Sequence, residues 1–472
     1  MKNDQNYLNL LGKVEKFNSG VCFIDENKKK FLYKNIIEKS EILTQDLQPR
    51  SLIFVLVSNN IDSLTGYLGF FRKGLVQVLL DPKINVALLQ QLIRTYLPRY
   101  LFLPISRNES FQYYDLVSKF NNHKILKLNK TNQYSINKNL ALLLTTSGST
   151  GSKKFVRISY RNIYENTKNI IKYLNIDKSH RAITTMPPYY TYGLSIINTH
   201  LYSGALIFVT NMKVIEKNFW QIFNKHKIMS FGGVPYFYEI IKKLNFNKLN
   251  LPNLKYFTQA GGPLNRGLME YFLDYAESNK IKFIVMYGQV EATSRMTYLP
   301  HKISRKKIGS IGIPIPGGRI RLKNNKSKDD NKGEIIYEGT NVSMGYAKNF
   351  VSLKKGDENL GVLKTGDLAT RDEDGYLYIV GRKSRIVKLF GHRVSLDELE
   401  KILLKKGYHC LCYGFDNKVT IFYINKNYDN KILKYLSSTT NIHIGCFKLK
   451  HIKKFPINAI GKISYKKLAS FL

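Results

Sequence analysis

The sequence contains few cysteines and no long apolar run. It holds four cysteines in 472 residues, Cys22, Cys410, Cys412 and Cys446, and no two of them form a C-x-x-C pair. This number and spacing argue against a structural zinc site and against a disulfide framework. No apolar run approaches the roughly 18 residues that a membrane span needs, and the first residues contain no apolar segment of a signal peptide. We therefore expect a cytoplasmic protein without a membrane span.

Acidic residues are scarce as well. The chain has 34 Asp and Glu against 74 Lys and Arg, a formal net charge of +40, and residues 431–472 contain no acidic residue. Such an excess favours anionic partners such as nucleotides, coenzymes, an acidic carrier protein, nucleic acid or a membrane surface. The lysines are spread along the whole chain, however, and a lysine-rich bias on solvated faces gives the same total. No basic-aromatic module is visible, so nucleic acid is not an expected partner.

Alternation of apolar runs with helical spacing is the pattern that the sequence does have. Residues 51–58, 75–82 and 100–104 are short continuous apolar runs, as in parallel strands buried on both faces. The residues between them show the spacing of amphipathic helices, and similar runs recur up to about residue 290. This alternation predicts an α/β fold of parallel sheets flanked by helices. Several later runs end in glycine or proline clusters, where ligands bind in open α/β sheets.

The sequence pattern changes after about residue 310. Short strand signals with turn residues follow, and from about residue 385 strand, helix and strand patterns form a compact α+β segment. A chain of 472 residues exceeds what one core usually organises. We therefore expect a large N-terminal domain of parallel sheets over residues 1–383 and a small, mobile α+β domain over residues 384–472.

A loop rich in glycine and hydroxyl groups follows the apolar run Leu142–Leu144. Its sequence, "TTSGSTGSKK" over residues 145–154, would let backbone amides approach an anion, with hydroxyls as donors and a lysine as a charge. The spacing is not that of a Walker A loop. Taken alone, the loop fits both a phosphate cradle and a flexible surface connection.

This loop resembles the phosphate loop of the acyl-adenylate-forming superfamily, which includes acyl-CoA ligases, luciferases and the adenylation domains of peptide synthetases. Three further segments resemble that superfamily's motifs in the same order: "YGQVEAT" at 287–293, the run 363–400 with "TGD" and "GRKSRIVKLFG", and "FPINAIGKISYKKL" at 455–468. The resemblance spans nearly the whole chain. It implies an AMP-forming acid–thiol ligase, which activates a small carboxylic acid with ATP and Mg²⁺ and transfers the acyl group to a thiol.

The resemblance also implies roles for particular residues. Lys462 would bridge the substrate carboxylate and the α-phosphate, Glu291 would hold Mg²⁺, and both are the expected catalytic residues. The remaining residues would bind the nucleotide: Thr146, Ser147, Gly148, Ser149, Thr150, Gly151 and Lys154 the β- and γ-phosphates, Gly261, Gly262, Pro263, Tyr287 and Gly288 the purine, and Asp367 and Arg382 the ribose. In the superfamily the small domain rotates between adenylation and thiol transfer, and the hinge position falls on Ser384.

The sequence departs from the superfamily pattern at several positions. Lys153 and Phe155 stand where proline and glycine are usual, and Tyr190 stands where acyl-CoA ligases often have histidine. Val290 replaces a threonine whose hydroxyl contacts the α-phosphate. Losing one donor to developing charge costs about 3 kcal/mol in a dry site. A degenerate protein that binds the nucleotide without catalysis is therefore the alternative interpretation.

The sequence says less about which carboxylic acid is activated and which thiol accepts the acyl group than about the nucleotide site. Residues 181–200 contain no Asp or Glu, although amino-acid-activating members bind the ammonium group near this segment, so an α-amino acid is disfavoured. Six aromatic residues are either walls for an apolar or aromatic acid or ordinary core: Tyr189, Tyr190, Tyr192, Phe231, Tyr236 and Phe237. The thiol acceptor is coenzyme A or the phosphopantetheine of an acidic carrier protein, and no carrier domain is expected within this chain.

Overall fold

The computed structural model describes residues 16–109, 111, 113–129, 134–145, 154–324, 331–389, 392–425, 428, 430–440, 442–458 and 462–472. The chain forms two compact units. The large unit contains Met1–Ile308, Pro314–Arg319 and Glu338–Leu363, and the small unit contains Gly309–Ile313, Ile320–Tyr337 and Lys364–Leu472. The expected boundary at residue 384 falls inside the small unit. A hinge at Ser384 is not tested by this division and stays a prediction.

An eight-stranded sheet organises one part of the large unit. Its strand order is β19-β9-β8-β4-β3-β5-β7-β6, with β3, β4, β5 and β8 parallel in the middle. The bounds are β3 (Leu52–Leu56), β4 (Val76–Leu80), β5 (Tyr100–Pro104), β6 (Tyr114–Phe120), β7 (His123–Leu128), β8 (Leu140–Thr145), β9 (Phe155–Ser159) and β19 (Tyr346–Ala347). Every residue of β3 and β4 is buried, as expected for parallel strands covered on both faces.

A nine-stranded sheet organises the rest of the large unit, in the order β16-β15-β14-β13-β12-β10-β11-β1-β2. The bounds are β1 (Val21–Ile24), β2 (Lys30–Leu32), β10 (Arg181–Ile183), β11 (Leu206–Phe208), β12 (Ser230–Gly233), β13 (Tyr256–Gln259), β14 (Lys282–Tyr287), β15 (Thr297–Tyr298) and β16 (Ile313–Pro314). Strands β10, β12, β13 and β14 are parallel neighbours. Their carboxyl ends therefore meet at one edge of this sheet, where ligands bind in open α/β folds.

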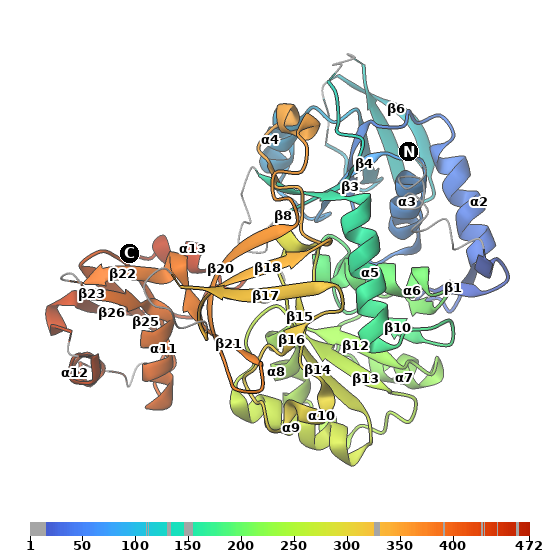
Figure 1. Cartoon of the computed structure of the whole chain (residues 1–472). Coiled ribbons are helices and arrows are strands. Elements are labelled where there is room, and N and C mark those ends of the chain that lie inside the picture. The colour runs from blue at the N-terminus through green and yellow to red at the C-terminus, as the bar shows by residue number, and fades with distance from the viewer. Residues whose placement is uncertain are drawn as a thin grey trace. The chain divides into compact units, whose positions relative to one another are not determined.

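Helices on both faces bury these sheets. One hydrophobic core joins residues of both sheets with residues of α2 (Tyr33–Thr44), α3 (Ile61–Arg72), α5 (Tyr160–Leu174) and α6 (Thr191–Tyr202). Helices α5 and α6 lie side by side (Figure 1). A capping box formed by Ser159 and Asn162 begins α5, because each side chain accepts a hydrogen bond from the other residue's backbone N–H. The sequence therefore starts this helix directly after strand β9.

An aromatic core covers the other face of the nine-stranded sheet. The rings of Phe231, Phe257 and Phe283 stack on adjacent strands, with centroids 5.4 and 4.7 Å apart, and contact aromatic residues of the neighbouring helices. These helices are α7 (Lys217–Lys225), α8 (Pro235–Lys243) and α9 (Arg266–Ser278), with a short η2 (Phe246–Lys248) between the last two. The outer helices α4 (Val86–Tyr96) and α10 (His301–Ser304) and the short η4 (Phe350–Lys354) complete the large unit.

Among the described residues, the small unit contains most of one four-stranded sheet, two smaller sheets and three α-helices. The sheets have the orders β17-β18-β20-β21, β22-β23 and β24-β25-β26. The bounds are β17 (Gly318–Lys323), β18 (Lys332–Gly339), β20 (Val362–Arg371), β21 (Leu377–Arg382), η5 (Lys383–Arg385), β22 (Ile386–Leu389), β23 (His392–Ser395), α11 (Leu396–Lys405), β24 (Cys410–Phe415), β25 (Lys418–Tyr423), α12 (Lys431–Thr440), η6 (Ile444–Cys446), β26 (Phe447–His451) and α13 (Tyr465–Ala469).

The architecture confirms the predicted fold class, an α/β protein with a large sheet-rich unit and a smaller one (Figure 1). Among the described residues, no helix has the length and apolar character that crossing a bilayer requires.

Candidate active site

The residues expected to bind the purine lie at the carboxyl edge of the nine-stranded sheet. Gly261, Gly262 and Pro263 follow β13, whereas Tyr287 and Gly288 lie at the end of the adjacent parallel strand β14. Gly261 has a φ of 92°, a conformation that glycine adopts without strain. The side-chain amide of Gln259 donates a hydrogen bond to the Gly262 carbonyl at 2.7 Å and closes this turn. The structure therefore brings these five predicted residues to one edge.

Gly288 is required by the backbone that passes over it. A Cβ at this position would lie 1.7 Å from the carbonyl oxygen of Ser294, so no larger residue fits. The Met296 N–H donates to the Tyr287 carbonyl at 2.8 Å, which folds residues 288–296 back onto β14. This return contains the short η3 (Val290–Ala292). Val290 is buried in the core of the large unit, so the residue that replaces the expected threonine serves packing.

Glu291, on the same turn, contacts a tyrosine that the sequence did not single out. The Tyr346 hydroxyl donates to Oε1 of Glu291 at 2.8 Å, and Lys154 Nζ lies 3.9 Å from the centroid of the Tyr346 ring. Burial, and to a smaller extent the Glu291 charge, raise the pKa of Tyr346, so this phenol keeps its proton as the donor. Two residues with predicted roles, Glu291 and Lys154, are thus joined through Tyr346. The segment "GYA" around it matched none of the motifs singled out in the sequence.

Strand β9 holds Tyr346 in place. Tyr346 pairs with Val156 in the antiparallel β9–β19 ladder, and Lys154 directly precedes β9. Arg157 on β9 is fully buried, and its Nη2 donates to the Met344 carbonyl at 2.5 Å and to Glu358 Oε2 at 2.7 Å. Tyr346 therefore stands on a ladder whose partner strand begins directly after Lys154.

The residues present fit a nucleotide-bound Mg²⁺ better than a metal cage built by the protein alone. No cluster of three or more His, Cys, Asp or Glu occurs among the described residues. Mg²⁺ is usually held by one or two carboxylates together with phosphate oxygens and water. Glu291 would supply one such carboxylate. The rest of the predicted phosphate loop, Thr146, Ser147, Gly148, Ser149, Thr150 and Gly151, lies outside the described residues, as does Lys153.

Asp367 and Arg382 form an ion pair in the small unit. They are partners in the β20–β21 ladder, and Arg382 Nε lies 2.7 Å from Asp367 Oδ1. Asp367 is only 2% exposed, and its backbone N–H donates to Thr365 Oγ1 at 3.0 Å. The ladder and the ion pair thus position this carboxylate.

Lys462 lies close to this pair. Its backbone N–H donates to Asn458 Oδ1 at 2.9 Å, its carbonyl accepts from the Asn458 N–H at 2.8 Å, and Ile457 bridges Ile463. Burial and the Arg382 charge lower the pKa of Lys462 to about 8, against the opposing effect of Asp367. The structure therefore brings together the three predicted residues of the small unit. Gly461, which precedes Lys462 in the sequence, lies outside the described residues.

A second ionic network anchors the segment after Lys462. Arg385 pairs with Asp397 and, at 2.6 Å, with Glu400 Oε1, and its guanidinium lies 3.7 Å from the centroid of the Tyr465 ring. The Tyr465 hydroxyl donates to Glu400 Oε2 at 2.8 Å. Helix α13 is thereby fastened to α11 and to the residues that follow β21. Spacing alone did not indicate this network, because its members come from three separate elements.

The candidate walls of the acid site separate into two groups. The hydroxyl of Tyr192, at the start of α6, donates to the Thr258 carbonyl at 2.8 Å, and the Tyr190 and Tyr192 rings lie edge to face at 6.5 Å. These tyrosines therefore lie on the α6 side of the nine-stranded sheet. Phe231 belongs to the aromatic core on the opposite face, so its ring is core and not a wall beside Tyr192.

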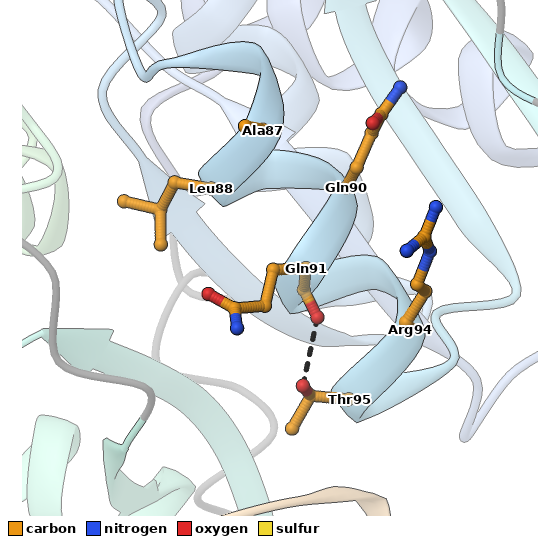
Figure 2. Close-up of a pocket in the computed structure, with 6 residues that line it drawn as sticks. All are labelled: Ala87, Leu88, Gln90, Gln91, Arg94 and Thr95. Carbon is orange, nitrogen blue, oxygen red and sulfur yellow. Dashed lines mark hydrogen bonds between the residues drawn. The ribbon is translucent and has the colours of Figure 1, made fainter.

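A shallow hollow elsewhere on the large unit contains none of these residues. It follows one side of α4 and is lined by Ala87, Leu88, Gln90, Gln91, Arg94 and Thr95 (Figure 2). The Thr95 hydroxyl donates to the Gln91 carbonyl at 2.8 Å, one turn earlier on the same helix. All lining residues come from a single helix, so the hollow offers no converging catalytic groups.

Comparison with known proteins agrees with the geometry. The family model described as "AMP-binding enzyme" matches residues 32–347. The 2-succinylbenzoate–CoA ligase of Listeria innocua is 24% identical over 340 residues, which cover 70% of this chain and 69% of that protein. The sulfoacetate–CoA ligase of Cupriavidus necator is 30% identical over 276 residues, which cover 56% and 52%. The chain spans about half the length of most of the curated relatives it matches.

Solved structures share the fold over nearly the entire chain. The o-succinylbenzoate coenzyme A synthetase of Bacillus subtilis in complex with AMP has a TM-score of 0.78 at 18% identity, with 98% of each chain covered. ATP-bound MatB from Rhodopseudomonas palustris has a TM-score of 0.76 at 18% identity, again with 98% of each chain covered.

Proposed function

The chain belongs to the AMP-binding enzyme family, and from this premise we propose that it is an AMP-forming acid–thiol ligase. In the first step a carboxylate oxygen attacks the α-phosphorus of ATP, the bond between the α-phosphorus and the bridging oxygen breaks, and pyrophosphate leaves. In the second step a thiolate attacks the acyl carbon, the thioester forms and AMP leaves. The curated relatives are named as CoA ligases, and this supports both steps.

The observation that carries this proposal is the surroundings of Lys462. A lysine beside the Asp367–Arg382 pair, on a turn fixed by Asn458, can supply a positive charge to two anions that repel each other. Activation requires this help, because the attacking carboxylate and the α-phosphate are both negative. We propose that Lys462 holds them together and that Asp367 accepts hydrogen bonds from the ribose.

In the large unit, we propose that Glu291 holds the magnesium ion of the nucleotide and that Lys154 contacts its outer phosphates. Magnesium bound there would neutralise charge that develops on the departing pyrophosphate. The Tyr346 hydroxyl fixes Glu291 and its ring fixes Lys154, so both side chains are oriented before the nucleotide binds. Gly261, Gly262, Pro263, Tyr287 and Gly288 would line the purine.

We propose a carboxylic acid without an α-ammonium group as the substrate and coenzyme A as the acceptor. The relatives are named for 2-succinylbenzoate, oxalate, sulfoacetate and 4-coumarate, and none of these acids is an amino acid. The lack of Asp and Glu in residues 181–200 agrees with this choice. An acidic carrier protein is the second acceptor to test, because residues 431–472 are basic. The cytoplasm is the proposed location.

Acid-dependent pyrophosphate release from Mg-ATP, with hydroxylamine to trap the acyl group, tests the proposal. We expect release with at least one class in a panel of aromatic, aliphatic and dicarboxylic acids. Lys462→Ala should lower the rate by at least 100-fold, whereas Lys453→Ala, which removes an exposed lysine of the same unit, should not change it.

ATP binding without release from any acid would favour the degenerate alternative instead. Val290→Thr then becomes the informative variant, because it restores the hydroxyl whose loss motivates that alternative.

A further inference from the structure

One buried arginine of the large unit has no acidic partner among the residues that the structure describes. Three arginines are buried among the described residues, Arg157, Arg295 and Arg385, which are 0%, 2% and 9% exposed. Arg157 pairs with Glu358, and Arg385 pairs with two carboxylates. Arg295 forms no ion pair with any residue that the structure describes. An uncompensated buried charge costs several kcal/mol, so its retention calls for an explanation.

The contacts of Arg295 leave much of its guanidinium unused. Nη1 donates to the Tyr173 hydroxyl at 3.2 Å and Nη2 donates to Ser195 Oγ at 3.1 Å. The Tyr192 ring centroid lies 5.1 Å from the guanidinium carbon, and Nε has no hydrogen-bond partner in the described part of the chain. A guanidinium carries five N–H donors in a planar fork that matches a carboxylate. These contacts use two of the five.

The titratable groups around Arg295 are neutral near pH 7. Burial raises the pKa of Tyr173 and of Tyr192, and raises the pKa of Tyr256 to about 12, so these tyrosines keep their protons. Burial lowers the pKa of His200 to about 4, and the Arg295 charge adds to this effect. The Arg295 charge is therefore not neutralised by any of these neighbours. In a region of low dielectric such a charge attracts an anion strongly.

Arg295 also lies beside the candidate acid site. It lies after Glu291 in segment 288–296, which folds back over Gly288. It contacts Tyr192 and Ser195 in the first turns of α6. Tyr192 in turn bonds to Thr258, shortly before the glycine turn at Gly261. The arginine thus connects the segment that carries Glu291 with the segment that carries the candidate walls of the acid site.

We propose that Arg295 binds a second acidic group, a carboxylate or a sulfonate, on the acid that the enzyme activates. This inference rests on the proposed function and narrows its substrate class to diacids. The second acidic group supplies the counter-charge that the described residues of the chain do not. The Nε–H and the remaining Nη hydrogens supply charge-assisted hydrogen bonds to its oxygens. An acid with only the reacting carboxylate leaves this charge uncompensated and binds less well.

Matched pairs of acids that differ by one acidic group test the proposal. Suitable pairs are 2-succinylbenzoate with 4-oxo-4-phenylbutanoate, adipate with hexanoate, and 3-sulfopropanoate with butanoate. Each acid is assayed for pyrophosphate release and for its effect on the melting temperature, because a ligand that binds the folded state stabilises it whether or not it reacts. The variants are Arg295→Met, Arg295→Lys and, as a control, Arg305→Met, which loses an exposed arginine paired with Asp274 and Glu277.

We expect the wild type to favour the diacid of at least one pair by about tenfold or more in kcat/KM. Arg295→Met should abolish most of this preference, through loss of activity with the diacid, and Arg295→Lys should retain part of it. Arg305→Met should keep the wild-type preference. The melting temperature should rise with the diacid in the wild type and in Arg305→Met, but not in Arg295→Met.

Equal losses with both members of every pair would overturn the proposal and make Arg295 a structural residue. A preference for the diacid that survives in Arg295→Met would overturn it as well. If no acid releases pyrophosphate, the proposed ligase function fails, and the melting temperatures then decide about Arg295 alone. If Arg295→Met does not fold, the diacid preference of Arg295→Lys relative to Arg295→Gln decides in its place.

Discussion

At the scale of single residues, the charge of Lys462 follows from what surrounds it. Burial and the nearby Arg382 disfavour the ammonium form, and Asp367 favours it, with the net result that the pKa falls to about 8. A lysine that must be cationic to join two anions then loses its function within an accessible pH range. This makes the role of Lys462 testable without removing it.

We predict that kcat/KM for ATP in the first step falls as pH rises through about 8, because kcat/KM reports ionisations of the free enzyme. The sign follows from the proton: below this pH Lys462 is charged and effective, and above it the lysine is neutral. In Lys462→Arg the remaining activity should lose this fall, since a guanidinium stays charged. A profile that falls at the same pH in both proteins would assign the ionisation to another group.

Tyr346 allows a second test at this scale. Tyr346→Phe removes the hydrogen bond to Glu291 and keeps the ring under Lys154. We predict that the affinity gained by adding Mg²⁺ to ATP decreases by about tenfold, because a charge-assisted hydrogen bond contributes about 1.5 kcal/mol or more. Binding of ATP without Mg²⁺ should not change.

Titration calorimetry with and without Mg²⁺ measures both quantities. Tyr271→Phe, which removes an exposed hydroxyl bonded to Asn247, is the matched control and should behave as the wild type. An unchanged Mg²⁺ dependence in Tyr346→Phe would show that the hydroxyl does not orient Glu291 for the metal.

The sequence predicted some of these residues as site residues and did not indicate others. Asp367, Arg382 and Lys462 lie in segments whose motifs resemble a known superfamily, and the structure brings them together. Tyr346 and Arg295 carry no such signal. A tyrosine in "GYA" and an arginine after "EATS" acquire their surroundings from tertiary contacts with distant segments. Spacing within the sequence does not encode such contacts.

At the scale of elements, the β9–β19 ladder connects two parts of the candidate site. Strand β19 is only two residues long and lies far from β9 in the sequence. Arg157 compensates for the short ladder by binding the Met344 and Lys355 carbonyls and the Glu358 carboxylate. Because Tyr346 stands on β19 and Lys154 directly precedes β9, the ladder keeps these two residues close to each other.

We predict that Arg157→Met destabilises the protein by about 3 kcal/mol, because buried carbonyls lose a charged donor. Urea denaturation would report the loss as a lower midpoint with a similar slope. Glu358→Gln should cost less than about 1 kcal/mol, since this side chain is half exposed and the arginine keeps its other acceptors. Similar losses in both variants would place the stabilisation in the ion pair and not in the carbonyl contacts.

The strands show where the sequence pattern is enough to predict which residues are buried and on which face of the sheet they lie. The continuous apolar runs of β3 and β4 predicted fully buried parallel strands, and this is confirmed. Phe231, by contrast, was open to two interpretations. Strand alternation decides which face a residue occupies, and the structure puts the Phe231 ring among aromatic residues on the face opposite to Tyr192. The sequence could not decide this because the short strand β12 has no alternating pattern.

At the scale of the whole molecule, each unit forms its own part of the candidate site. The large unit joins Glu291, Tyr346 and Lys154 and gathers the purine residues at one sheet edge. The small unit joins Asp367, Arg382 and Lys462. The chain length and the change of sequence pattern after about residue 310 predicted a large and a small domain. In the structure, β21 and the part of β20 that follows Leu363 belong to the small unit, and they carry Arg382 and Asp367.

The formal net charge of +40 has no single location in this account. Basic residues are distributed over both units and include the segment 431–472, which has no Asp or Glu. Such a charge attracts anions in general, and we expect specificity to come from buried or partly buried groups such as Lys462 and Arg295.

The central claim is that a carboxylate oxygen of the substrate attacks the α-phosphorus of ATP. The most direct test uses the best acid of the panel, labelled with ¹⁸O in its carboxylate, and analyses the products by mass spectrometry. The account predicts one ¹⁸O atom in AMP, since the oxygen that attacked the α-phosphorus stays with it when the thiol displaces AMP. Label in inorganic phosphate, or AMP that carries no label, would contradict it.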